Sequence, residues 1–120
     1  MKSHWLTHQG KRILFCDCTQ LTQSDLEILK SELNGVEGLI LLEAEQSVLM
    51  LCDIRGSIAT PEALDPFKQF STHTAKYIQK LAVLGVSGLK KVLFDALVQL
   101  SGMHATAYDE MENALDWLVE

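Results

Sequence analysis

The apolar residues of the chain fall into short runs that alternate between the two-residue period of strands and the longer period of helices. Five runs carry the strand pattern, namely residues 4–8, 11–18, 47–54, 80–86 and 104–108. The first two are joined by Gln9-Gly10, a pair that favours a hairpin turn. Residues 47–54 are apolar on both faces until Asp53, which is typical of a central strand that is covered on both sides.

A first helix is predicted after Thr22, because Asp25 follows three residues later as in a capping box. Apolar residues at helical spacing come next, at Leu26, Leu29 and Leu33. The pair Asn34-Gly35 predicts an interruption of this helix. Residues 36–44 are then expected to continue as a second helical piece, with a strand over residues 39–42 as the alternative.

The second helix has two alternative starts, Thr60-Pro61 and Asp65-Pro66, because a capping residue followed by proline is typical of a first helical turn. This helix is expected to end near Tyr77. A third helix is expected to open at Ser87-Gly88 and to run to Leu100, with Gly102 as the glycine that follows its end.

The last helix is predicted from a capping box made by Asp109 and Glu112. Its expected buried stripe is Met111, Ala114, Leu115 and Leu118. The resulting order is β-β-α-β-α-β-α-β-α, in which strands alternate with helices after an initial hairpin. This order predicts an α/β protein with a single mixed, mainly parallel sheet, formed by one domain over residues 1–120.

The charge of the chain narrows the classes of partner. The net charge is −6, which argues against a nucleic-acid binder that relies on bulk charge. Residues 66–94 hold five lysines and no acid, whereas residues 109–120 hold five acids and no base. Such a split can present two surfaces of opposite sign to a protein partner, a second copy of the chain or a small anionic ligand.

Hydropathy and cysteine usage indicate the compartment. Uninterrupted apolar stretches, such as residues 39–42, are far shorter than a membrane span, so no integral membrane contact is expected. The first residues contain no apolar leader, and the chain has the odd number of three cysteines. Together these features predict a reducing, cytoplasmic location.

The cysteines are Cys16, Cys18 and Cys52. Cys16 and Cys18 are two positions apart in one expected strand, so both thiols point to the same side. Their backbones are then about 6.5–7 Å apart, which is the upper limit of the separation that a disulfide can bridge. Three thiols are enough in principle to bind zinc, but the usual spacing of two intervening residues is absent. The thiols are therefore interpreted as small buried apolar groups, and no metal and no cofactor are expected.

Candidate binding residues follow two of the expected parallel strands, at the edge where ligands of such sheets bind. One set lies in the loop after the central strand: Asp53, Arg55, Gly56, Ser57 and Thr60. The other set lies at the start of the third helix, where free amides favour an anion: Ser87, Gly88, Lys90 and Lys91. Hydrogen bonds within these loops are the alternative role for the same residues.

Three stretches of the chain resemble the small bacterial STAS-like proteins that are related to anti-sigma-factor antagonists and to the CRAL-TRIO lipid-binding superfold. They are residues 51–57 (LCDIRGS), residues 82–91 (AVLGVSGLKK) and residues 108–118. The resemblance implies a STAS-like fold and a regulatory or binding role. It also implies a phosphorylatable serine at the start of the helix after the third strand, for which Ser57 is the candidate, although the serine-glycine pair of that motif is missing here.

No arrangement of nucleophile and base with its flanking glycines is visible in the sequence. We therefore expect a non-enzymatic regulatory or protein-interaction domain that binds a partner protein or associates with itself. The alternative is a binder of a small anionic or lipophilic ligand, held by the helix N-termini at the carboxyl edge of the sheet.

Overall fold

The computed structural model describes residues 1–58 and 60–120. Its elements follow the predicted order of strands and helices. They are β1 (His4–His8), β2 (Lys11–Asp17), the 3-10 turn η1 (Gln23–Asp25), α1 (Leu26–Ile40), β3 (Val48–Asp53), α2 (Pro61–Thr74), β4 (Ile78–Leu84), α3 (Leu89–Ser101), β5 (Ala105–Tyr108) and α4 (Met111–Val119).

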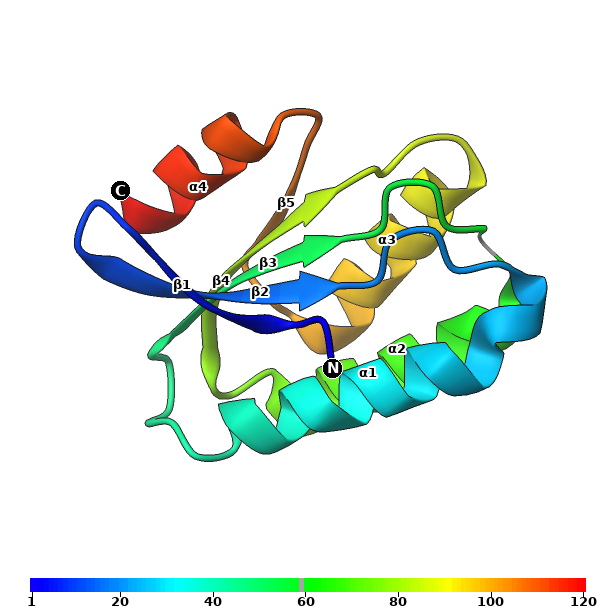
Figure 1. Cartoon of the computed structure of the whole chain (residues 1–120), viewed down its shortest axis with the longest axis horizontal. Helices are drawn as coiled ribbons and strands as arrows, with labels where there is room; N and C mark the ends of the chain where they lie inside the picture. Colours follow the sequence, from blue (N-terminus) through cyan, green and yellow to red (C-terminus); the bar gives the residue numbers. More distant parts are fainter. Residues whose placement is uncertain (59) are drawn as a thin grey trace.

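The strands form one sheet in the order β1-β2-β3-β4-β5 (Figure 1). β1 pairs with β2 in an antiparallel hairpin, and every later pair is parallel. The central strand β3 is buried at each of its six positions, as its doubly apolar pattern predicts. The predicted fold class, α/β with a mainly parallel sheet and an N-terminal hairpin, is therefore confirmed.

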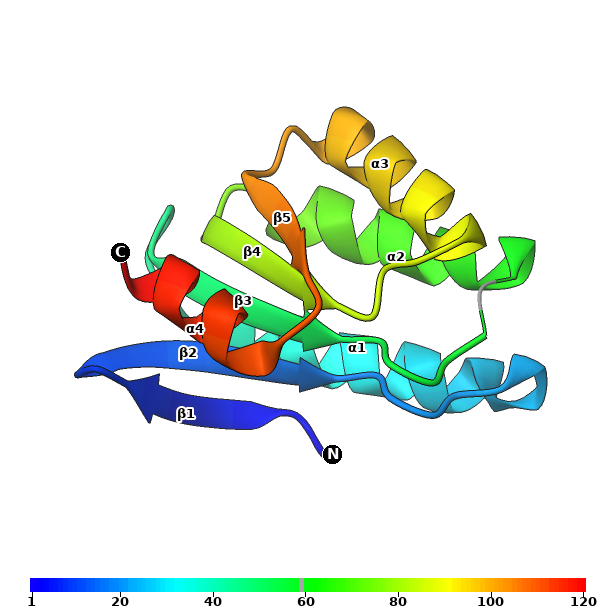
Figure 2. The same ribbon diagram turned by 90° about the horizontal axis from the view of Figure 1, so that it is seen from above.

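Helices cover both faces of the sheet (Figures 1 and 2). α1, α2 and α3 lie on one face, and their apolar residues pack on Leu14, Cys16 and Met50 of β2 and β3. α4 lies on the opposite face. There, Ala114 and Leu118 pack against the strand residues that alternate with those of the first layer, such as Ile13 and Leu51. The two-residue period of each strand thus divides the core into two layers.

The expected interruption at Asn34-Gly35 is wrong, because α1 runs through both residues without a break. Its buried stripe continues at helical spacing across them, through Leu29, Leu33, Val36 and Ile40. Burial of this stripe outweighs the penalty of about 1 kcal/mol for a glycine inside a helix. Residues 36–40 are helical as expected, but they belong to α1 itself, which ends at Ile40. Residues 41–43 form a turn and a bend, so the alternative strand over residues 39–42 does not exist.

α2 begins at the first of its two candidate prolines. The side chain of Thr60 accepts a hydrogen bond from the Ala63 amide as an N-cap, and Pro66 lies inside the helix. The expected end near Tyr77 is wrong, since α2 ends at Thr74. β4 accordingly begins at Ile78, two residues before the predicted start of this strand.

The predicted capping box of α4 is also wrong. Glu110 is the N-cap residue, and no side chain caps this helix. The predicted buried stripe is nevertheless correct, since Ala114 and Leu118 are buried and Met111 and Leu115 pack beside them. At the other helix end foreseen from sequence, Gly102 adopts a left-handed conformation directly after α3.

None of the described helices is both long enough and apolar enough to cross a bilayer.

Candidate functional site

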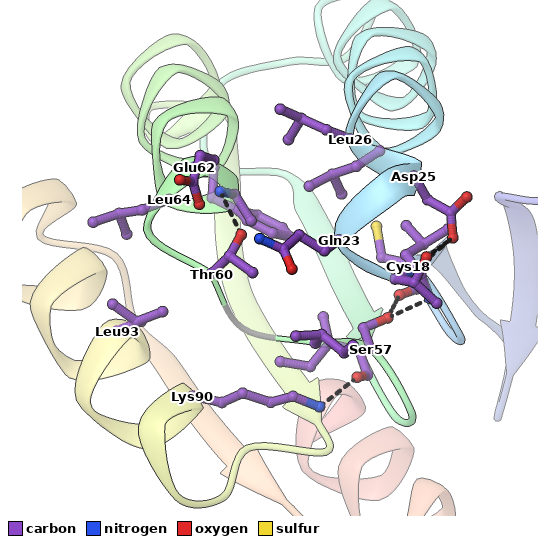
Figure 3. A pocket seen from close by; sticks show the side chains of 17 residues that line it. Cys18, Gln23, Asp25, Leu26, Ser57, Thr60, Glu62, Leu64, Lys90 and Leu93 are labelled. Carbon is purple, nitrogen blue, oxygen red and sulfur yellow. Dashed lines mark hydrogen bonds between the residues drawn. The ribbon is translucent and has the colours of Figure 1, made fainter.

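β2, β3 and β4 end at one edge of the sheet, and the segments that leave this edge lead into η1 and α1, into α2 and into α3. The starts of these helices surround a pocket of about 290 Å³ (Figure 3). Its wall is mostly apolar, with side chains that include Leu21, Leu26, Leu29, Ile54, Ala63, Phe67 and Leu93. Parallel sheets bind ligands at this edge, so the pocket lies where the sequence placed the candidate site.

Asp53 ends β3, and Arg55 lies in the loop that follows this strand. The Asp53 side chain is only 3% exposed, and its carboxylate accepts hydrogen bonds from Arg55 Nη2 at 2.7 Å and from Arg55 Nε at 3.0 Å. The Arg55 amide donates to the same carboxylate at 3.0 Å, and these bonds to Asp53 raise the pKa of Arg55. The pair therefore fixes the turn after β3, which is the structural alternative considered from sequence.

Ser57 joins two loops at the edge of the sheet. Its hydroxyl accepts a hydrogen bond from the Leu21 amide at 3.0 Å and donates one to the Cys18 carbonyl. Gly56, directly before it, has a φ of +75°, which a glycine adopts without strain. Phosphorylation of Ser57 stays a prediction, and it requires the hydroxyl to give up its bond to the Cys18 carbonyl.

The candidate residues of the third helix divide into two groups. Lys90 lines the pocket, where its Nζ donates to the Ile54 carbonyl at 2.9 Å, and burial lowers the pKa of Lys90 (Figure 3). Lys91 points elsewhere, since its Nζ contacts Asp95 at 2.8 Å on an exposed surface. Ser87 and Gly88 form the exposed turn before α3. The structure thus brings Ser57, Thr60 and Lys90 together around one pocket and leaves Lys91 outside it.

The contribution of α1 to this site was not foreseen. Leu26 and Leu29 of α1 line the pocket, beside Leu21 from the loop before η1. Asp25 of η1 and Glu62 of α2 add two carboxylates to the lining. The helical spacing of apolar residues predicted that α1 has a buried side. Spacing alone does not tell which element that side faces. That element is α2, which packs beside α1 on the same face of the sheet (Figure 2).

α3 carries an apolar surface that faces away from the core. Leu89 is 57% exposed, Val92 63% and Leu100 70%, and their spacing places them on one side of the helix. No residue of α3 is fully buried, so this helix covers the sheet loosely. Ile58, in the loop before α2, is another large exposed apolar residue and lines the pocket together with Leu93 of α3.

The three cysteines converge at the floor of this region. Cys16 and Cys52 are direct partners in the β2-β3 pairing, and all three Sγ atoms lie within 4.8 Å of one another. The hydrogen bond with Cys16 and the proximity of the Cys52 thiol lower the pKa of Cys18. The hydrogen bond with Cys18, together with burial, raises the pKa of Cys16. The pKa of Cys52 is raised as well, by the neighbouring Cys18 thiol and by burial. The thiols are buried as predicted, and Cys52 lies on the strand adjacent to Cys16, an arrangement that the sequence analysis considered when it weighed a zinc site.

Comparison with known proteins defines the fold and leaves the activity open. No protein-family model and no curated protein matches the chain. An uncharacterised protein of the DUF3478 family from Shewanella loihica PV-4, described as having a SpoIIAA-like fold, superposes with a TM-score of 0.74 at 17% identity. The match covers 97% of this chain and 91% of that one. The chain therefore has the SpoIIAA-like, STAS-type fold that its sequence motifs resemble.

Proposed function

We propose that the protein is a non-enzymatic regulatory domain that binds a second protein chain through the exposed apolar side of α3. The observation that carries this proposal is the stripe of Leu89, Val92 and Leu100, each more than half exposed. Large apolar side chains that gather, exposed, on one side of a helix are a feature of protein-interaction sites. Leu89 follows the Ser87-Gly88 turn at the carboxyl edge of the sheet, which belongs to the predicted contact, and the stripe runs from there along α3.

The two residues that the sequence offered as catalytic candidates, Asp53 and Ser57, already form hydrogen bonds within the protein. Asp53 is held by Arg55, and the Ser57 hydroxyl is bonded to the backbone on both sides. This engagement supports a binding role over a catalytic one, since neither group is free to act on a substrate. The proposed partner presents an apolar surface to α3, and a second copy of the chain is the first case to measure.

Val92→Asp is expected to weaken association at least about 30-fold, equivalent to about 2 kcal/mol, because it places an unpaired carboxylate in the apolar contact. Light scattering and sedimentation over a concentration series measure self-association directly. If the native chain is monomeric, quantitative affinity capture from its source cells compares the native chain with the variant. Leu42→Asp is the matched control, since Leu42 is 81% exposed on a turn after α1. Equal association of all three chains would contradict the proposal.

A second candidate function is the binding of a small lipophilic or anionic ligand. The mostly apolar pocket of about 290 Å³ favours it, since it is only slightly below the range of about 300–1,000 Å³ that is usual for small-molecule sites. Lys90 is positioned to meet an acidic headgroup, but Asp25 and Glu62 line the same pocket. These carboxylates favour a ligand whose apolar part supplies most of the affinity.

Calorimetric titration with dodecanoate and with dodecanol tests this second function. If the apolar wall dominates, both compounds bind, and Lys90→Gln weakens only dodecanoate, by about three- to tenfold, because one charge-assisted contact is lost. Lys68→Gln is the control, since Lys68 is exposed on α2 and outside this pocket. Absence of heat and of thermal stabilisation with both compounds would exclude a lipophilic ligand of this size.

A further inference from the structure

Three sulfur atoms meet inside the protein, from β2, from the residue directly after β2 and from β3. The Sγ atoms of Cys16 and Cys18 are 3.7 Å apart, and all three Sγ atoms, with that of Cys52, lie within 4.8 Å of one another. The residues are only 0%, 1% and 6% exposed, respectively. No disulfide joins them. Such a concentration of soft donors is more than a buried apolar contact requires.

Strand pairing creates this cluster. Cys16 of β2 lies directly beside Cys52 of β3 in the parallel register. The chain turns after Asp17, and the Cys18 amide continues the ladder by bonding to the Asp53 carbonyl at 2.9 Å. Cys18 therefore stays next to the other two thiols, and the backbone on both sides holds their separation. A preformed donor set reduces the ordering that a metal ion would otherwise impose on binding.

We propose that Cys16, Cys18 and Cys52 form a three-sulfur site for a soft monovalent metal ion, with Cu(I) as the ion that fits it. A metal–sulfur bond of about 2.3 Å places three sulfurs of a trigonal site about 4 Å apart, close to the spacing found here. Each coordinating thiol releases its proton to solvent as its bond to the metal forms. No change of oxidation state is involved.

The donor set selects against other ions. Zn(II) in structural sites takes four ligands, and among residues 1–58 and 60–120 no fourth His, Cys, Asp or Glu belongs to the group. Iron–sulfur clusters are usually held by four protein ligands, either four cysteines or two cysteines with two histidines, and Mg²⁺ and Ca²⁺ prefer oxygen donors. Thiolates select soft ions, and three of them satisfy Cu(I). The site needs no ligand from outside the three cysteines.

The metal has a route to the cluster. Cys18 lines the pocket at the carboxyl edge, so its thiol is the first of the three that an incoming complex meets (Figure 3). Cys52 lines a second cavity, of about 100 Å³, under α2 and α3. Ligand exchange from a small thiol complex of Cu(I) onto Cys18, followed by transfer inward, requires no unfolding of the sheet. The inference is independent of the proposed binding role of α3.

The test is an anaerobic titration of the fully reduced native chain with Cu(I) in the presence of bicinchoninate, a chromophoric competitor. We expect one Cu(I) per chain and an X-ray absorption spectrum with three sulfur neighbours at about 2.3 Å. Failure to compete with bicinchoninate, or a spectrum with only two sulfurs, would overturn the proposal. A parallel titration with Zn(II) decides between the ions, and preferential retention of zinc would overturn the assignment to Cu(I).

Cys52→Ala is expected to weaken Cu(I) binding by about 100-fold or more, since removal of even an outer partner of a metal ligand costs 10–100-fold. Val83→Ala is the matched control, because Val83 is the register partner of Cys52 on β4, is equally buried and offers no donor. Circular dichroism checks that both variants fold. Equal binding by Cys52→Ala and the native chain would show that Cys52 is not a ligand and would overturn the three-sulfur site. If Cys52→Ala does not fold, the sulfur count of the native chain decides the question.

Discussion

Gly85→Ala is expected to lower the free energy of unfolding by about 3 kcal/mol. Gly85 follows β4 with a φ of +93°, a conformation that costs a residue with a side chain about 1–2 kcal/mol. A Cβ at this position would also lie 2.8 Å from the Arg55 amide nitrogen and 2.9 Å from its Cα. The obstacle is backbone, so it cannot rotate away, and overpacking of this kind costs a further 1–3 kcal/mol or so.

The consequence of Gly85→Ala reaches the candidate site, because Arg55 belongs to the loop that Asp53 holds in place. Urea unfolding followed by circular dichroism measures the loss of stability. Gly102→Ala separates the two causes: Gly102 has a φ of +69° but nothing within 4 Å of the added Cβ, so we expect a loss of only about 1 kcal/mol. Equal losses in the two variants would show that the close approach of the loop to β4 contributes nothing.

Leu118→Ala is expected to cost about 3–4 kcal/mol. Leu118 is 1% exposed and packs from α4 onto the face of the sheet opposite to α1, α2 and α3. Truncation of a fully buried leucine removes its transfer free energy and leaves a cavity, which together usually cost about 2–5 kcal/mol. Since the cavity lies on the other side of the sheet, the pocket and the three cysteines are expected to keep their geometry.

Urea unfolding of Leu118→Ala tests this prediction, with Leu42→Ala as its control. Leu42 is 81% exposed, so its truncation is expected to change the stability by less than about 0.5 kcal/mol. A loss below about 1 kcal/mol in Leu118→Ala would mean that α4 does not contribute to the core as described. Retention of Cu(I) binding by Leu118→Ala would show that loss of packing on the α4 face of the sheet does not disturb the cysteine cluster on the other face.

The molecule consists of a packed scaffold and of loops at the carboxyl edge of the sheet. Both core layers and α4 support the sheet, whereas the loops after β2 and β3 carry polar groups that are bonded to one another. Most of these bonds are internal to the loops, so the edge is ordered before any partner arrives. Loops that are already ordered lose less conformational entropy when a partner binds, which favours a role in protein binding.

Much of the fold could be predicted from local patterns. Some signals act over only a few residues and can therefore be identified from the sequence. They include the apolar run that forms β3, the capping threonines Thr22 and Thr60, and the glycine after α3. The errors occurred where local and tertiary preferences conflict. Asn34-Gly35 disfavours a helix by itself, yet α1 continues because its buried stripe continues.

The sequence also identified residues around the carboxyl edge, since the position of a residue after a parallel strand follows from the order of the elements. It did not reveal which of them face each other. Lys90 and Lys91 are neighbours in sequence, but only Lys90 lines the pocket, because side chains on a helix point about 100° apart. The sequence alone therefore determined the architecture and the edge. Only the tertiary structure placed Cys52 beside Cys16 and Cys18, since strand register is a long-range property that neither spacing nor composition encodes locally.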